Sequence, residues 1–251
     1  MKHALVTGAG SGIGAVIALS LAEAGYRVSL LGRRLEPLET TAASAPEGSC
    51  QTLTCDVGKG EDVATSFSAA TETFGPIDVL VNCAGMAPTA PFHKLTSEQW
   101  QAVLNTNLNG VFHCTSRVIA DMRERRDGRI INIASTASLK GYAYVSAYCA
   151  AKHGVLGLTR ALALETAELG ITVNAICPGY TDTDIIRQSV QQIVEKTGRS
   201  EEQALAQFTN TNPQGRLIQP DEIAGTVLWL CSDAARSVTG QALSISGGET
   251  M

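Results

Sequence analysis

Hydrophobic positions along the chain follow two patterns that alternate with each other. Short runs that are apolar at almost every position, such as 4–7 and 77–81, are typical of strands buried on both faces of a parallel sheet. Longer segments with apolar residues every three or four positions are typical of helices with one buried face. The pattern predicts strands at 4–7, 27–31, 50–55, 77–81, 129–133, 172–176 and 242–245. It predicts helices at 13–24, 35–43, 62–73, 97–123 with a bend near Gly110, 147–168 and 221–230.

The order of these elements predicts the fold class. Strand and helix alternate along the whole chain, which is the signature of an α/β protein with a parallel sheet. We therefore expect a single doubly wound parallel sheet of the Rossmann type, with helices on both faces. No repeat, low-complexity tract or linker interrupts the pattern, so residues 1–251 are expected to form one domain.

One connection is longer and more polar than the others. After the strand at 172–176, helical patterns appear at 185–196 and 201–208 before the next core element. Such a connection leaves the sheet at its carboxyl edge, where open α/β sheets bind ligands. We expect the segment at about 179–214 to act as a lid over the substrate.

Composition excludes several classes of protein. A net charge of -5 argues against a nucleic-acid partner, since phosphate backbones attract basic surfaces. The seven cysteines are scattered and contain no CxxC pair, and the four histidines show no metal-ligand spacing, so no metal site is expected. The N-terminal residues lack a signal-peptide pattern and no apolar stretch is long enough to span a membrane, so a cytoplasmic location is expected.

A glycine-rich turn follows the first predicted strand. The run TGAGSGIG covers 7–14 and leads directly into a predicted helix. Glycines at 8, 12 and 14 allow a tight turn and leave room for a phosphate at the helix N-terminus. A tight turn between strand and helix can also need glycine for geometry alone. In this strand–turn–helix context the run predicts dinucleotide binding.

The run YCAAK at 148–152 raises a second question of chemistry. Tyr148 and Lys152 lie four positions apart, so a helix places both side chains on one face. Such a pair is either a solvated surface pair or a tuned acid, because a cation beside a phenol stabilises the phenolate. Ser135 lies thirteen residues before Tyr148, at the end of a predicted strand where ligands bind. The pair alone does not decide between the two interpretations.

The ordered set of motifs resembles the short-chain dehydrogenase/reductase family. The set comprises TGAGSGIG, VNCAG at 81–85, NTNLNGVF at 105–112, INIAS at 131–135, YCAAK and CPG at 177–179. The resemblance covers essentially the whole sequence, and one departure is Cys83, where the family often has a second asparagine. It is nearest in look to β-ketoacyl thioester ketoreductases and 3-hydroxybutyrate dehydrogenases, so a secondary alcohol and a ketone are the expected reactants.

The resemblance implies roles for four residues. Tyr148 is expected to act as general acid in reduction and as general base in oxidation, with Lys152 lowering its pKa. Ser135 is expected to orient the substrate carbonyl. Asn107 is implied to fix a water that links Lys152 to solvent. A hydride from a nicotinamide cofactor completes this chemistry.

Cofactor binding is expected to involve residues from many segments. NADP(H) is expected in preference to NAD(H), because Gly32 stands where NAD enzymes carry an acid and Arg33 follows it. Arg33 and Arg34 can also be ordinary solvated charges at a strand end. The predicted set is Gly8, Ser11, Gly12, Ile13, Gly14, Arg33, Asp56, Val57, Asn82, Ala84, Gly85, Tyr148, Lys152, Pro178, Gly179, Thr181 and Thr183.

The substrate is inferred from positions aligned by motif. Ala87, Ala137 and Val145 stand where hydroxybutyrate dehydrogenases grip a free carboxylate, and none of them can hydrogen-bond an acid. Together with Tyr142 and Ile186 they predict a pocket for a 3-ketoacyl thioester or similar bulky ketone, with Arg187, Lys196 or Arg199 available for a carrier phosphate. A dehydrogenase of a small hydroxy acid or polyol is the alternative. A nucleotide-sugar epimerase and a non-catalytic dinucleotide-binding protein are remoter ones.

The expected assembly also rests on the resemblance. Family members pair the long helices that here carry Asn107 and Tyr148. The predicted helix at 147–168 is apolar over much of its circumference, which suits burial on more than one side. A homotetramer is therefore expected.

Overall fold

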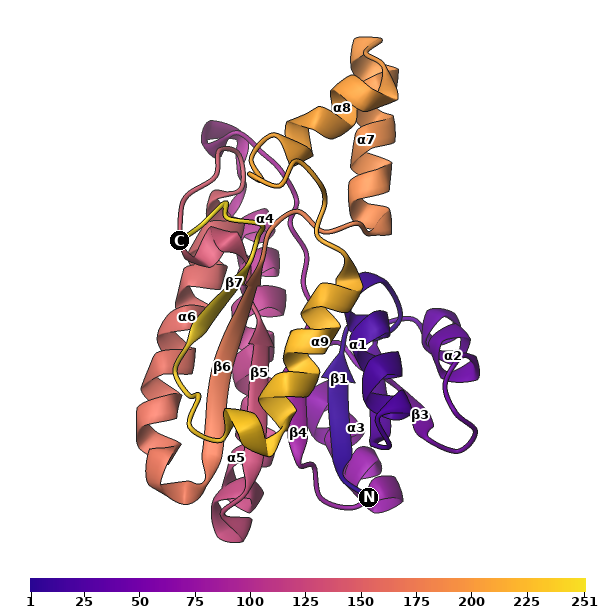
Figure 1. Ribbon diagram of the computed structural model, residues 1–251, viewed down its shortest axis with the longest axis vertical. Coiled ribbons are helices and arrows are strands. Elements are labelled where there is room, and N and C mark those ends of the chain that lie inside the picture. Colours follow the sequence, from indigo (N-terminus) through magenta and orange to yellow (C-terminus); the bar gives the residue numbers. More distant parts are fainter.

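The structure, a computed structural model that describes residues 1–251, contains one parallel sheet (Figure 1). Its seven strands lie in the order β3-β2-β1-β4-β5-β6-β7, so the predicted α/β fold class with a doubly wound sheet is confirmed. Each predicted strand appears within two residues of its expected position. The strands are β1 His3–Thr7, β2 Arg27–Gly32, β3 Cys50–Thr54, β4 Val79–Asn82, β5 Gly128–Ile133, β6 Ile171–Pro178 and β7 Ala242–Ile245.

Nine α-helices accompany the strands. The two patterns in the long connection after β6 form helices α7 and α8, as expected. No helix is both long enough and apolar enough to cross a membrane. The helices are α1 Gly12–Glu23, α2 Leu35–Ala43, α3 Gly60–Phe74, α4 Ser97–Leu104, α5 Gly110–Arg125, α6 Ser146–Thr166, α7 Asp184–Thr197, α8 Glu201–Thr209 and α9 Pro220–Cys231.

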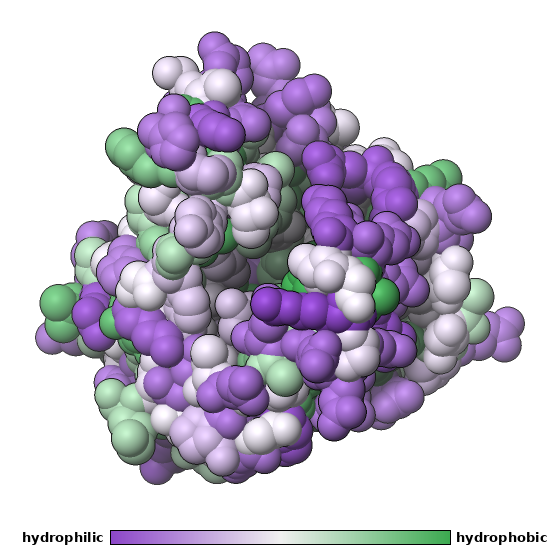
Figure 2. Space-filling view, turned by 90° about the horizontal axis from the view of Figure 1, so that it is seen from above, coloured by the Kyte–Doolittle hydropathy of each residue, from purple (hydrophilic) through white to green (hydrophobic).

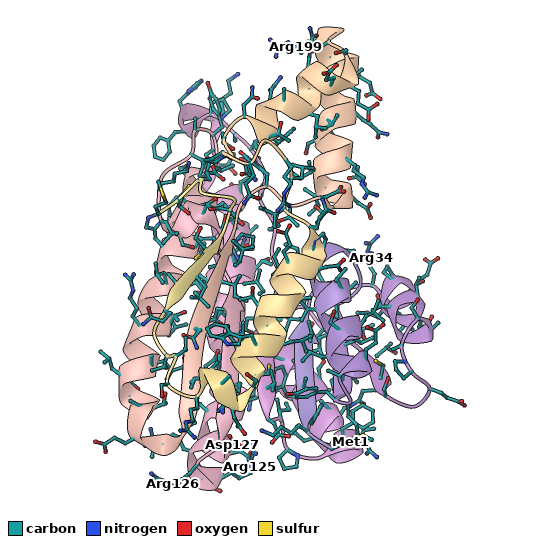
Figure 3. All side chains as sticks on the ribbon, in the orientation of Figure 1. Met1, Arg34, Arg125, Arg126, Asp127 and Arg199 are labelled. Carbon is teal, nitrogen blue, oxygen red and sulfur yellow. The ribbon has the colours of Figure 1, made fainter.

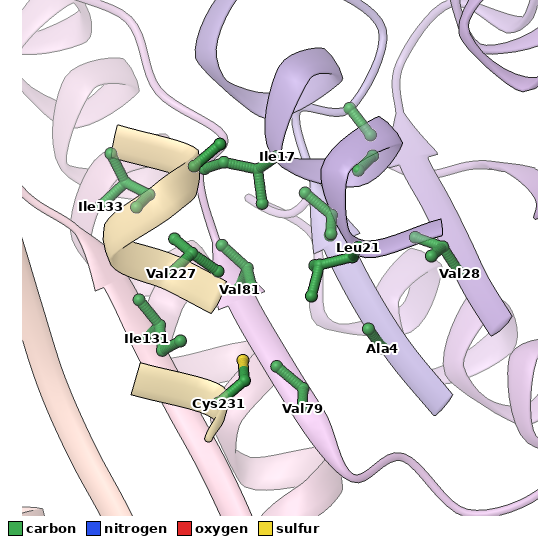
Figure 4. Packing of buried hydrophobic residues seen from close by; sticks show 14 of the residues in the cluster. Ala4, Ile17, Leu21, Val28, Val79, Val81, Ile131, Ile133, Val227 and Cys231 are labelled. Atoms are coloured by element: carbon green, nitrogen blue, oxygen red, sulfur yellow. The ribbon is translucent and has the colours of Figure 1, made fainter. Parts of the chain in front are cut away.

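The sheet is buried on both faces because its strands are apolar at consecutive positions. Val79 and Val81 of β4 point to one face, where Ile17 and Leu21 of α1 pack beside Val227 of α9 (Figure 4). The intervening Leu80 belongs to a second cluster on the other face, built with residues of α3, α5 and α6. Continuous apolar strands are thus explained by helices on both sides.

One predicted helix differs from expectation. The pattern at 97–123 predicts a single helix bent near Gly110, whereas the structure inserts a π-helical segment at Asn105–Asn109 between α4 and α5. The extra residue in this wider turn shifts the helix register ahead of Gly110. Gly110 itself lets the helix approach Val57, whose Cγ2 would lie 2.7 Å from an added Cβ. Asn107 lies at the centre of the π-helical segment.

The reversal of strand order lies between β1 and β4. Strands β1, β2 and β3 extend outward in turn, and the polypeptide then crosses back to place β4 on the other side of β1. At this point the buried Thr7 hydroxyl, at the end of β1, accepts hydrogen bonds from the N–H groups of Cys83 and Ala84, both at 3.0 Å. The loops after β1 and β4 are therefore joined where such sheets bind ligands.

The α7–α8 segment stands above this carboxyl edge. In Figure 1 both helices project beyond the tips of β6 and β7, and the C-terminus lies at the same end of the sheet. The segment begins after Gly179, and its exit, at residues 210–216, returns toward the sheet beside the C-terminal residues. Two parts of the protein that are distant in sequence thus meet at the edge where the strands end.

Candidate active site

A cavity of about 750 Å³ opens at the carboxyl edge of the sheet. It extends from the glycine turn after β1 to the α7–α8 segment, and Figure 2, which looks from above, shows the surface hollowed near its middle. The volume lies within the range of ordinary cofactor and ligand pockets. All of the predicted cofactor and substrate residues line this cavity except Asn82, and of the four predicted catalytic residues only Asn107 lies outside its lining.

The glycine turn is shaped by close backbone contacts. Gly8 has a φ of 69° and lies so near the loop after β4 that an added Cβ would be 2.9 Å from the Cα of Ala84. An added Cβ on Gly14 would collide with the carbonyl oxygen of Gly8. The turn therefore brings the N-terminus of α1 against the cavity with its N–H groups free of side-chain caps. This cradle fits the phosphates of a dinucleotide.

Tyr148, Lys152 and Ser135 line the same part of the cavity. Lys152 is 4% exposed, and its Nζ donates a 2.7 Å hydrogen bond to the carbonyl oxygen of Ile133. The Nζ also lies 5.6 Å from the centre of the Tyr148 ring. Ser135 follows β5, so the sheet edge and helix α6 place the three side chains together. The pair at 148–152 is therefore not a solvated surface pair.

Burial controls the titration of both site residues. It lowers the pKa of Lys152 to about 8, because the charged form loses water. Burial also raises the pKa of Tyr148, and the Ser135 hydroxyl opposes this shift by hydrogen bonding. Burial is the largest influence on the pKa of Tyr148, which is raised overall. Tyr148 is therefore protonated at neutral pH.

Asn107 holds the loop after β4 rather than facing the cavity. It is fully buried, and its side-chain oxygen accepts from the Met86 N–H at 3.2 Å. Its amide nitrogen donates to the carbonyl oxygens of Met86 and Val103, both at 2.9 Å. Gly85 permits this arrangement, because an added Cβ would be 2.8 Å from the Asn107 oxygen and 3.9 Å from Lys152 Nζ.

Asn82 is the predicted cofactor residue that the structure places elsewhere. Its side chain is 4% exposed and donates to Asn132 at 2.9 Å and to Thr115 at 3.4 Å. Asn132 in turn donates to Thr159 at 2.9 Å. This network joins β4 and β5 to helices α5 and α6, so the Asn82 amide links secondary-structure elements and does not line the cavity.

Several cavity residues were not among the predicted site residues. Arg34, which Figure 3 labels, lines the cavity beside Arg33, and both residues are exposed with no ion pair or side-chain hydrogen bond. Thr136, Tyr180 and Phe208 also line it. The sequence signals for these three were adjacency to Ser135 for Thr136, adjacency to the CPG run for Tyr180, and a place in the predicted lid for Phe208.

The three cations expected to bind a carrier phosphate, Arg187, Lys196 and Arg199, are poorly placed for that role. Arg187 forms ion pairs with Asp182 at 3.0 Å and with Asp184 at 3.8 Å, so its charge is already compensated. Neither Lys196 nor Arg199 lines the cavity, and Figure 3 shows Arg199 at the far tip of the α7–α8 segment. These three residues do not form a phosphate site beside the reacting groups.

Comparisons with known proteins agree with this geometry. The short chain dehydrogenase family profile matches residues 2–194. A putative ketoacyl reductase of Streptomyces coelicolor is 43% identical over 98% of this chain and 95% of its own length. An acetoacetyl-CoA reductase of Shinella zoogloeoides is 42% identical over 99% of this chain and 98% of its own. The crystal structure of an actinorhodin polyketide ketoreductase variant with NADPH, 42% identical, covers 99% of this chain and 97% of that chain with a TM-score of 0.94.

These findings define an oxidoreductase that uses a nicotinamide dinucleotide. The protein belongs to the short-chain dehydrogenase family, and it acts on CH–OH groups and their ketones. The resemblance noted from the ordered motifs is thereby confirmed.

Replacing Asn107 by alanine is expected to destabilise the protein. The change removes three hydrogen bonds, from the Met86 N–H and to the carbonyl oxygens of Met86 and Val103, and opens a void at a fully buried position, which costs about 1–3 kcal/mol. Urea unfolding measures the loss. Asn210→Ala is the matched control, because Asn210 is exposed and makes no side-chain hydrogen bond. Equal stability of the two variants would contradict the bridging role of Asn107.

Proposed function

We propose that the protein reduces a 3-ketoacyl thioester, or a similarly bulky ketone, to the 3-hydroxy product with NADP(H). The observation that carries the substrate class is the wall of the cavity beside Ser135. Ala87, Ala137 and Val145 line it and offer no hydrogen-bonding side chain. A free carboxylate buried there would lose its hydration without gaining a hydrogen-bonding partner, whereas an acyl chain needs no such partner. The names of the related ketoacyl and acetoacetyl-CoA reductases support the same substrate class.

The residues at the cavity divide the proton chemistry among them. A bound nicotinamide cofactor supplies the hydride. The Tyr148 hydroxyl, protonated at neutral pH, donates its proton to the carbonyl oxygen of the ketone in reduction. Ser135 orients that oxygen with a hydrogen bond. Lys152 places a partly desolvated cation beside the phenol, which stabilises the phenolate left after proton transfer. Asn107 is proposed to fix a water that links Lys152 to solvent, and the support is that its side-chain oxygen and Lys152 Nζ both lie within 4 Å of one point beside Gly85.

Tyr148→Phe is expected to lower kcat by at least ~100-fold, because it removes the proton donor and keeps the ring. NADPH affinity, measured by fluorescence titration, is expected to change by less than ~3-fold, since the phosphates are held at the glycine turn. Steady-state oxidation of NADPH measures turnover. Near-native turnover of the Phe variant would remove Tyr148 from the mechanism.

The preference for NADP(H) rests on two arginines and a glycine. Arg33 and Arg34 line the cavity without an ion pair, so both guanidinium groups are available to a 2′-phosphate. Gly32 ends β2 in close contact with Leu38, whose Cδ2 would lie 3.3 Å from an added Cβ. An acidic side chain, as NAD enzymes use at this place, would require that leucine methyl to shift slightly.

Substituting these arginines tests the cofactor preference. Arg33→Ala, or Arg34→Ala if that guanidinium holds the phosphate, is expected to lower the ratio of kcat/KM with NADPH to that with NADH by about 10–100-fold, as for a lost charge-assisted hydrogen bond. Arg236→Ala, an exposed arginine at a distance from the cavity lining, is the control. An unchanged ratio in both Arg33 and Arg34 variants would contradict the proposed preference.

A small set of ketones tests the substrate class. With NADPH, acetoacetyl-CoA is expected to show at least ~10-fold higher kcat/KM than free acetoacetate, since the cavity wall leaves the acid unpaired. A cyclic ketone is expected to fall between the two. A clear preference for the free acid would instead favour the alternative, a dehydrogenase of a small hydroxy acid.

The α7–α8 segment is suited to the role of a lid over the substrate. Thr183, which precedes α7, approaches Gly12 so closely that its Cγ2 would be 3.2 Å from an added Cβ. Ile186 of α7 and Phe208 of α8 line the cavity. The segment therefore contacts both the glycine turn and the substrate region, so residues 1–251 act as one catalytic unit with the lid at about 179–214.

Exposed apolar residues on α5 and α6 support the proposed homotetramer. Phe112 is 58% exposed and Leu164 is 83% exposed, although both helices pack on the sheet through their other faces. Light scattering is expected to give four times the mass of one subunit at micromolar concentration, and a stable monomer would contradict the assembly. The cytoplasmic location remains part of the proposal, and its support is that all seven cysteines are free.

A further inference from the structure

Glu249, near the C-terminus, is a buried carboxylate that has no part in the chemistry described above. Its side chain is 1% exposed. Its Oε1 accepts a 2.6 Å hydrogen bond from the Tyr142 hydroxyl and pairs with Lys140 Nζ at 3.0 Å. Burying a carboxylate is costly unless charged and hydrogen-bonding partners compensate it. Tyr142 lines the substrate cavity and Glu249 does not, so the carboxylate approaches this wall from behind.

The direction of the hydrogen bonds follows from the donors available. An ionised carboxylate only accepts, so the single hydroxyl proton of Tyr142 goes to Glu249. Thr136 Oγ1 lies 2.7 Å from the Tyr142 oxygen and is left to donate its own proton to it. Thr136 directly follows Ser135. The Tyr142 hydroxyl is therefore committed on both sides, and the substrate meets its ring rather than a free donor.

The segment that carries Glu249 also contacts both ends of the lid. An added Cβ on Gly179, at the lid entry, would lie 3.1 Å from Glu249 Oε2 and 3.3 Å from Ser246. At the lid exit, Gly247 is in close contact with the side chain of Asn212. Aromatic rings continue the same wall of the cavity. The Tyr142 ring meets the Tyr180 ring edge-on, with 6.3 Å between ring centres, and the Tyr180 ring meets the Phe208 ring edge-on, with 5.1 Å between ring centres.

We propose that Glu249 is a positioning residue that sets substrate choice: by holding the Tyr142 hydroxyl, it presents an aromatic wall to an acyl chain and withholds a donor from a free carboxylate. This inference rests on the proposed reduction of a bulky ketone. The selectivity of the site then depends on a residue from the C-terminal segment, about 100 positions away from the catalytic tyrosine in sequence.

The test compares two substrates in the same variants. Glu249→Gln replaces the charged acceptor by a neutral amide oxygen, which holds the Tyr142 hydroxyl less strongly and lets it donate to a bound acid, so the ratio of kcat/KM for acetoacetyl-CoA to that for free acetoacetate is expected to fall about tenfold, mainly through a lower KM for the acid. In the double variant with Tyr142→Phe there is no hydroxyl to free, so the ratio is expected to match that of Tyr142→Phe alone. Glu47→Gln, an exposed carboxylate without partners, is the matched control.

Two results would overturn the inference. One is a Glu249→Gln ratio equal to that of the wild type and of the control. The other is a shifted ratio that persists in the double variant, because the effect then does not pass through Tyr142. If Glu249→Gln fails to fold, Glu249→Asp replaces it, since it keeps the charge that pairs with Lys140 but is one methylene too short to reach Tyr142. The same shift is expected from it.

A second measurement separates this inference from the proposed function. If the wild type reduces neither substrate, the proposed function fails, and the position of Tyr142 is then measured by alkaline ultraviolet titration. Burial first, and then the hydrogen bond to Glu249, raise the pKa of Tyr142. The ionisation of Tyr142 is identified as the titration step that is missing in Tyr142→Phe. This step is expected at lower pH in Glu249→Gln than in the wild type. An unmoved step would refute the contact itself.

Discussion

The hydroxyl of Thr7 makes the contact on which the rest of the site depends. Parallel strands end at one edge, and the strand order reverses there between β1 and β4. Strand pairing holds β1 beside β4 only as far as Val6 and Val81. Two 3.0 Å hydrogen bonds from the backbone of Cys83 and Ala84 to the Thr7 oxygen hold them together. Gly8 then approaches Ala84 closely, and the phosphate cradle and the Asn107-supported loop share one wall.

Desolvation is the second constraint on the chemistry of the site. The same burial that lowers the pKa of Lys152 to about 8 raises the pKa of Tyr148. In the proposed mechanism Tyr148 donates a proton to a ketone, so burial, which keeps the phenol protonated, suits reduction. In the proposed oxidation Tyr148 acts as a base, and the nearby lysine cation favours the phenolate that this requires. The balance between burial and charge at these two residues therefore affects the proposed proton transfer in both reduction and oxidation.

The carboxyl edge also brings together segments that are distant in sequence. The α7–α8 segment leaves the sheet at Gly179, and the C-terminal residues return to the same edge after β7. Both segments meet the loop that carries Tyr142, so this wall of the cavity is assembled from three separate parts of the protein. A change in the C-terminal segment therefore acts on this wall through packing and hydrogen bonds.

The sequence by itself determined the α/β class, all seven strands and the group Ser135, Tyr148 and Lys152, because apolar periods and local motif spacing report backbone structure directly. It predicted an irregularity near Gly110 in the helix at 97–123 but not its form, the π-helical segment at Asn105–Asn109 directly before that glycine. Only the tertiary structure decided that the Asn82 side chain bridges elements and that Glu249 lies behind Tyr142. Those outcomes depend on which distant groups meet when the sheet closes, and no local period or spacing in the sequence records such contacts.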